Sequence, residues 1–179
     1  MKILWILATA LLIGLPTVNA QDVPKQKPQA DKFELFSSAF KQGEDIPSKY
    51  SCEGGDINPP LEMKNIPSKT QSLALTIHDP DAPEGTWVHW VVYNIPPSKT
   101  VIEENSIPGY QSLNDFGKYN YGGPCPSNEK AHHYIFRAYA LNTILDIDEG
   151  MTMKDLERAM NGHVVAKSEL VGIYRKPVW

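Results

Sequence analysis

The sequence predicts a mainly β protein, a sandwich of antiparallel sheets with a few peripheral helices near the C-terminus. Two runs, 72–78 (SLALTIH) and 87–95 (WVHWVVYNI), are rich in β-branched and aromatic residues and are bounded by Pro and Gly. Fifteen prolines and twelve glycines favour many turns and few long helices. A helical pattern follows these strands, at 152–164, which is the order expected of a sandwich with attached helices.

The first twenty residues have the order of parts of a cleaved secretory signal peptide. Lys2 gives a short positive start, residues 3–15 form an apolar run, and small residues precede Gln21. The run is shorter than the roughly 20 apolar residues that a membrane span needs. We therefore expect residues 1–20 to be removed and the mature protein to be periplasmic or secreted.

Two parts follow the expected cleavage site. Residues 21–32 are polar and contain prolines, which predicts a flexible leader, and residues 33–179 are enough for one domain with its own core. Residues 1–20 hold one lysine and no acid, so their removal changes the formal net charge from −4 to −5. A mildly acidic chain without a Lys/Arg cluster excludes nucleic acid as an expected partner.

The strand signals before the two clear runs are weaker. Residues 33–40 (FELFSSAF) give a first strand-like stretch, and the segment 43–58 that follows is rich in turn formers. Within that segment, residues 46–47 and 50–52 could form a short strand.

The run 87–95 should lie in the middle of the fold. Simple alternation places four of its side chains on one face, namely Trp87, His89, Val91 and Tyr93. The remaining residues form an equally apolar second face, which predicts a strand between two layers. A long irregular stretch, 98–128, follows it and precedes another strand at 134–141 (YIFRAYAL). A loop of that length inside a compact domain is usually functional.

The C-terminal segment predicts a helix and a last strand. Thr152 should cap the helix with Asp155 three residues on, in a near capping-box arrangement. The residues that share one side of this helix at helical spacing are Met153, Leu156, Met160 and Val164. Gly162 is expected to end or kink the helix, and residues 170–175 (LVGIYR) to form the final strand.

Four of the five histidines flank two rigid segments. The first segment is 78–83 (HDPDAP), which directly follows a predicted strand and precedes His89. The second is 122–126 (GGPCP), which precedes His132 and His133 at the start of another strand. Prolines fix the backbone and glycines allow close approach of a ligand, so such segments often carry binding groups. The same Asp and Pro residues could also be ordinary turn formers.

These segments carry a family resemblance. The run DPDAPEGTWVHWVVYNIP, followed after a glycine-rich loop by GGPCPSNEKAHHYIFRAYAL, resembles the phosphatidylethanolamine-binding family and most closely its bacterial, Raf-kinase-inhibitor-like branch. The similarity extends over about residues 33–175 and includes the segment YSCEGGDINPPL. It implies a Greek-key β-sandwich with a small surface cavity for phosphate-like or acetate-like anions and phospholipid head groups.

The resemblance also implies a set of site residues. Cys125 stands where the eukaryotic branch has proline, and the longer eukaryotic insertion before the pocket histidine is absent. Kinase-binding and membrane-lipid roles are therefore less transferable than the pocket itself. The ligand-binding residues implied by motif are Asp79, Asp81, His89, Gly123, Pro124, His132 and Tyr134.

The residue types suit an oxyanion without any reference to the family. Imidazole, phenol and backbone N–H groups are all donors, and several of them converging in a hollow would hold an anion. Two free carboxylates would repel such a ligand. We therefore expect Asp79 to accept N–H bonds in the turn or to orient a histidine, and Asp81 to be a turn residue. His133 should face away from the site, and His78 and His163 should be structural.

The two cysteines leave two interpretations open. In an oxidising compartment Cys52 and Cys125 could form one disulfide, or they could be small buried residues that never meet. No C-x-x-C or His-paired spacing indicates a zinc site. We expect no metal and no cofactor.

Three classes of function remain possible, and the first is favoured. It is an exported binding protein for a small anion or a phosphorylated head group. The second is a regulatory or inhibitory protein that acts on a kinase, protease or host partner through the pocket rim, and a homodimer is suggested by bacterial relatives alone. A hydrolase or metal enzyme is disfavoured, since no G-x-S-x-G elbow or H-E-x-x-H helix is present. Membrane association should be peripheral at most.

Overall fold

The computed structural model describes residues 32–147 and 151–177. The predicted signal peptide, 1–20, and all but the last residue of the predicted leader, 21–32, lie outside the described residues, so these two predictions remain untested. The described part contains two antiparallel sheets, one α-helix and one short 3-10 helix.

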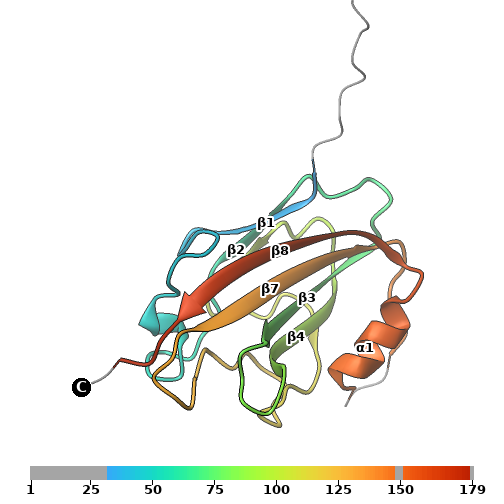
Figure 1. The fold of residues 1–179 in the computed structure, drawn as a ribbon. Coiled ribbons are helices and arrows are strands. Elements are labelled where there is room, and N and C mark those ends of the chain that lie inside the picture. The colour runs from blue at the N-terminus through green and yellow to red at the C-terminus, as the bar shows by residue number, and fades with distance from the viewer. Residues whose placement is uncertain (1–31, 148–150, 178–179) are drawn as a thin grey trace, which may run out of the picture. The chain divides into compact units, whose positions relative to one another are not determined.

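The larger sheet has five strands. Its strands lie in the order β6 (Tyr110–Gln111), β4 (Trp87–Ile95), β3 (Ser72–Asp79), β7 (His132–Leu141) and β8 (Val164–Tyr174). After the β3–β4 hairpin and β6, the chain returns so that β7 pairs with β3, which is the strand order of a Greek key. Figure 1 shows β7 and β8 side by side above β3 and β4.

The smaller sheet has three strands and closes one face of the larger one. Its order is β1 (Glu34–Ser37), β2 (Leu61–Lys64) and β5 (Val101–Ile102). Leu35, Met63 and Ile102 pack from this sheet into one buried cluster with Trp90 and Phe136 of the larger sheet. The core therefore lies between the two sheets, as in a sandwich.

One α-helix covers the other face of the larger sheet. Helix α1 (Met153–Met160) begins at the N-cap Thr152, where a capping box with Asp155 is present as predicted. The buried side chains of the helix are Met153, Leu156 and Met160, which pack with Val91 and Tyr93 of β4. Both faces of β4 are thus covered, which explains why neither face is polar.

Three predictions of local structure were wrong. The segment around Tyr50 forms a 3-10 helix, η1 (Ser48–Tyr50), and not a short strand. Val164 does not continue the helix, because Gly162 adopts a left-handed conformation (φ 79°) that turns the chain into β8. The last strand therefore starts at Val164 and not at residue 170. The predicted fold class, mainly β with helical structure near the C-terminus, is confirmed, and α1 is the α-helix described there.

Simple alternation also failed in β4, with a consequence for the site. The pairing with β3 shifts between Ile77, opposite Trp90, and His78, opposite Val88, so that β4 carries one extra residue at this point. Such a β-bulge re-aims the side chain at which it occurs. His89 consequently does not share a face with Val91, which packs toward α1; it contacts Tyr134, a member of the cluster between the sheets.

Candidate ligand-binding site

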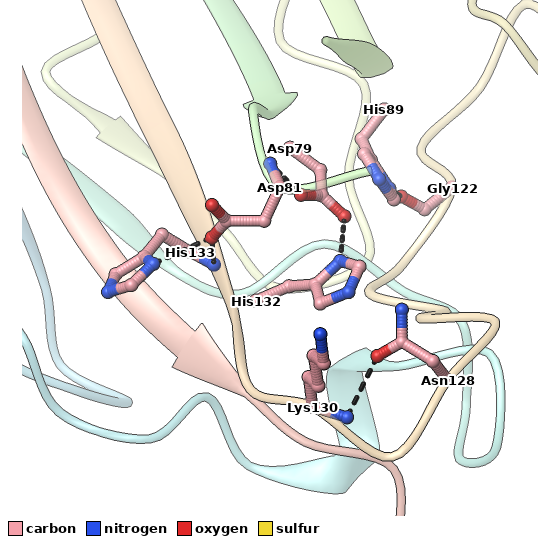
Figure 2. A network of polar contacts seen from close by, with 8 residues as sticks. All are labelled: Asp79, Asp81, His89, Gly122, Asn128, Lys130, His132 and His133. Carbon is pink, nitrogen blue, oxygen red and sulfur yellow. Dashed lines mark hydrogen bonds and ion pairs between the residues drawn. The ribbon is translucent and has the colours of Figure 1, made fainter. Parts of the chain in front are cut away.

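A buried carboxylate orients one histidine at the end of β3. Asp79 Oδ2 lies 2.8 Å from His132 Nδ1, and both side chains are almost fully buried (4% and 3% exposed). Asp79 Oδ1 accepts the N–H of Asp81 in the turn that follows. Because a carboxylate can only accept, His132 must donate through Nδ1, and its other ring nitrogen, Nε2, is left for a different partner. Figure 2 shows this contact between the ends of the two strands.

A backbone carbonyl orients the second histidine. His89 Nδ1 lies 2.8 Å from the carbonyl oxygen of Gly122, which can only accept, so His89 also donates through Nδ1. The Gly122 N–H returns a hydrogen bond to the carbonyl of His89. Burial lowers the pKa of His89, although the Gly122 carbonyl and the charge of Asp79 partly oppose this effect. The ring is therefore held neutral at neutral pH, with Nε2 as an unprotonated acceptor.

Tyr134 stands beside His89 in an edge-to-face contact with a centroid distance of 5.1 Å. Its hydroxyl is buried and has no partner with hydrogen-bond geometry among the described residues, although the Asp79 carboxylate and the Cys125 backbone lie near enough to influence it. Burial, reinforced by the nearby charge of Asp79, raises the pKa of Tyr134 well above its usual value. The phenol therefore keeps its proton and remains a donor.

A cavity of about 360 Å³ opens onto these groups. Its polar lining includes Asp79, His89 and His132, and its apolar lining includes Trp87 and Phe116. The ring of Phe116 packs edge-on against both Trp87 (5.5 Å between centroids) and His89 (5.2 Å). The cavity thus has a titratable polar side and an aromatic side, a combination typical of small-molecule sites.

The lip of the cavity, residues 122–127, is attached to the preceding loop. Cys52 and Cys125 form a disulfide, and the N–H of Cys52 donates to the carbonyl of Pro124. The Gly123 N–H, predicted to face the ligand, instead donates to Asp56 Oδ1 at 2.6 Å. A Cβ on Gly123 would lie 2.3 Å from the carbonyl oxygen of Tyr50, so glycine is required there for close packing.

Comparisons with known proteins show the family to which this chain is similar. The family model for phosphatidylethanolamine-binding protein matches residues 36–175. The chain belongs to the phosphatidylethanolamine-binding protein family. A UPF0098 protein of Pyrococcus horikoshii is 40% identical over 96% of this chain and 87% of its own length. A UPF0098 protein of Chlamydia trachomatis is 44% identical over 80% of this chain and 99% of its own length.

Solved structures of the family have the same fold. A phosphatidylethanolamine-binding protein homologue from Chlamydia trachomatis superposes with a TM-score of 0.79 at 42% identity and covers 82% of this chain and 99% of its own. E. coli YbcL, described as a member of the mammalian family, superposes with a TM-score of 0.76 at 32% identity and covers 82% and 100%. The Greek-key sandwich is therefore the fold of this family member.

The predicted site residues separate into two groups in this family member. Asp79, His89 and His132 line the cavity, and Tyr134 packs directly behind His89. Asp81 does not line it. Its carboxylate accepts the N–H of His133 and pairs with that ring, outside the cavity, which fits the turn role expected of Asp81 and the outward direction expected of His133. Gly123 and Pro124 support the lip without lining the cavity.

Sequence reasoning marked the stretch 98–128 as functional but did not identify the residues in it that form the aromatic side of the cavity. Asn114 Oδ1 accepts the N–H groups of Phe116 and Lys118, while its Nδ2 donates to the carbonyls of His89 and Asn120. This one buried side chain fixes the loop and hence the position of the Phe116 ring. A single Asn in a stretch rich in turn formers carries no periodic signal, so no pattern in the sequence could identify it.

The described residues contain neither a candidate metal centre nor a helix that could span a membrane. No group of three or more His, Cys, Asp or Glu side chains is placed to hold a metal ion among residues 32–147 and 151–177. None of the helices in the same ranges is long and apolar enough to cross a membrane.

Proposed function

We propose that this protein is an exported binding protein whose cavity holds a phosphate-like anion or a phosphorylated head group. One observation carries the proposal: two buried histidines each use Nδ1 on a fixed protein acceptor and both line the same cavity. Fixed rings present their remaining nitrogen in one direction, which reduces the entropy lost when a ligand binds. A further support is the Tyr134 hydroxyl: Tyr134 packs against His89 and is not among the residues that line the cavity, but a buried donor without a protein partner is rare and suits a ligand that reaches past His89.

The charge of the lining makes binding depend on protonation. No Lys or Arg is among the residues that line the cavity, whereas Asp79 and Glu84 are. The positive charge that an anion needs in this cavity must therefore come from protonated histidine side chains. The lowered pKa of His89 leaves its Nε2 an acceptor at neutral pH, and protonation turns this atom into a charged donor. An anion and a proton thus bind together, and affinity rises as pH falls.

We expect phosphate and phosphoethanolamine to bind more tightly at pH 5.5 than at pH 8, as followed by NMR titration of the histidine side chains. His89→Ala removes a charge-assisted hydrogen bond of about 1.5–3 kcal/mol, so its affinity should fall about 10- to 100-fold at the lower pH. Tyr134→Phe removes a neutral hydrogen bond of about 1 kcal/mol, and the expected loss is roughly fivefold.

The control for this experiment is His163→Ala, since His163 is exposed and bonds to Asn142 away from the cavity. This variant should bind as the native protein does. Native affinity in both His89→Ala and Tyr134→Phe would defeat the proposal, as would affinity that is equal at the two pH values.

The proposed export has its own test. The disulfide between Cys52 and Cys125 supports an oxidising compartment, and it agrees with the signal-like order of residues 1–20. We expect intact-mass analysis of protein from its native cells to show a chain that begins at Gln21 and contains no free thiol. A chain that retains residues 1–20 with two free thiols in the cytoplasmic fraction would contradict export.

A further inference from the structure

We infer that a second cleft, separate from the histidine cavity, binds an uncharged polyhydroxyl ligand of the size of one sugar ring. This cleft measures about 210 Å³, room for roughly seven water molecules at about 30 Å³ each. It lies on the other side of the 120–126 segment, where Asn120 and Tyr121 line it while Cys125 lines the first cavity. No lining residue is shared between the two.

Gln111 presents oriented donors to this cleft. Trp90 Nε1 donates to Gln111 Oε1 at 2.7 Å, and an indole N–H is a donor only. The atom of the Gln111 amide that faces Trp90 must therefore be its oxygen. The two N–H donors of the same amide have no protein partner in the described ranges, and Gln111 lines the cleft. A fixed amide with a free donor pair is suited to a ligand hydroxyl.

Two further amides stand on the rim with their backbones held in place. The N–H of Asn105 donates to the carbonyl of Asn58, and the carbonyl of Asn120 accepts from Asn114 Nδ2. The side chain of Asn58 is itself saturated, because it bonds Ser106 and two carbonyls of the surrounding loop. In contrast, neither the Asn105 nor the Asn120 side chain has a hydrogen-bond partner among the residues described. Each can donate and accept at once.

Asp56 supplies the one charged group in the lining. Its Oδ1 accepts the Gly123 N–H, which fixes the carboxylate and leaves Oδ2 as an acceptor. No Lys, Arg or His lines the cleft, so an anion would meet repulsion without compensation. Hydroxyl groups both donate and accept. The hydroxyl groups of one ligand can therefore bond to the three amides and to the carboxylate at the same time. A simple cation could use only the acceptors of the cleft, and an anion could use only its donors.

The apolar part of the lining completes the match. Ile107 is 68% exposed at the rim, and Trp90 and Tyr121 meet edge-to-face at 5.7 Å in the wall. A sugar ring has C–H faces between its hydroxyls, and the exposed Ile107 can cover such a face, while the almost fully buried Trp90 and Tyr121 form a rigid wall behind the amides. The combination of convergent amides and apolar contacts favours a saccharide over a fully polar ligand.

The test is a ¹H–¹⁵N NMR titration of the full protein with D-glucose, D-galactose, D-mannose, N-acetyl-D-glucosamine and myo-inositol. We expect at least one of them to shift the Trp90 indole and Gln111 side-chain signals saturably, without moving the signals of His89. Asn120→Ala should weaken that binding about two- to tenfold. Gln111→Glu keeps the acceptor for Trp90 but loses the free donors, and a similar or larger loss is expected.

The matched control is Asn161→Ala, because Asn161 is an exposed residue that lies outside the cleft, at the end of α1. This variant should bind sugar normally. The inference is overturned if no member of the panel gives a saturable shift, or if Asn120→Ala and Gln111→Glu bind as the native protein does. It is equally overturned if Ca²⁺ or putrescine gives the same shifts and Asp56→Asn abolishes them. None of these results tests the proposed binding of phosphate at His89, because the cleft and the histidine cavity share no lining residue.

Discussion

A variant that lacks both cysteines, Cys52→Ser with Cys125→Ser, is expected to unfold with a free energy about 4 kcal/mol below that of the native protein. The disulfide joins residues 73 positions apart. A covalent link of that span removes many conformations from the unfolded chain, and the chain-entropy relation gives about 4 kcal/mol for a loop of this length. This is a large share of the 5–15 kcal/mol that typically stabilises a domain.

The same bond has a local effect on the candidate site. Cys125 lies in the lip, and Cys125, Pro126 and Ser127 line the cavity. Among the described residues, the hydrogen bond within residues 125–131 is local, from the Lys130 N–H to Asn128 Oδ1, and beyond it the Cys125 backbone lies near the Tyr134 hydroxyl. The disulfide is therefore the tie that holds this part of the lip against the loop at Cys52. Its loss should cost ligand affinity as well as stability, because the lip would have to be ordered by the ligand.

Urea unfolding in the absence of phosphate measures the first effect, and phosphate titration of the folded proteins measures the second. Reduction of the native protein with dithiothreitol should reproduce both changes, while dithiothreitol should leave the double variant unchanged. An unfolding midpoint equal to that of the oxidised native protein would show that the bond does not stabilise the fold. Unchanged phosphate affinity would show that the lip is held by other contacts.

The fold was predictable where burial on both faces left a clear signal. Strands β3 and β4 are buried along almost their whole length, and their runs of β-branched and aromatic residues identify them. The first part of strand β8 was not predicted, because the side chains of Val164–Ser168 are exposed or partly exposed and none is buried. This part therefore lacks the regular spacing of apolar residues that marks a strand. Its first residue also happens to continue the helical spacing of Met160, and only the left-handed Gly162 separates the two elements.

The sequence indicated several of the residues that line the cavity, but it did not indicate how their side chains are directed. The motifs identified Asp79, His89 and His132, all of which line the cavity. The side on which His89 lies depends on the bulge in β4, and strict alternation cannot describe a strand with one extra residue. The hydrogen bond from the Gly123 N–H to Asp56 could not be predicted for a related reason, since Asp56 comes from a segment 67 residues away. Contacts of that separation leave no local pattern.

His78, predicted to be structural, has an environment that links stability to pH. Its Nε2 contacts Thr76 Oγ1 at 2.8 Å inside the larger sheet. Burial lowers the pKa of His78 to about 4, and the positive charge of Arg137 on β7 and the proximity of His89 on β4 act in the same direction. Asp115 and Glu169 oppose the shift but do not cancel it. The folded state therefore binds this proton less readily than the unfolded state, where histidine has a pKa of about 6.5.

We expect the free energy of unfolding to fall by about 2 kcal/mol between pH 7.5 and pH 5 through His78 alone. The contribution is present above pH 6.5 and is lost as pH falls toward 4, because the unfolded state takes up the proton first. Urea unfolding without phosphate should show this decline in the native protein and in the exposed-histidine control His163→Gln. Gln cannot titrate, so in His78→Gln most of this decline in the free energy of unfolding should disappear. An undiminished decline in that variant would show that another group causes the acid sensitivity. His89 is then the next candidate, because its pKa is lowered in the same direction. Since acid is also expected to tighten anion binding at His89, added phosphate should restore stability at pH 5 more than at pH 7.5.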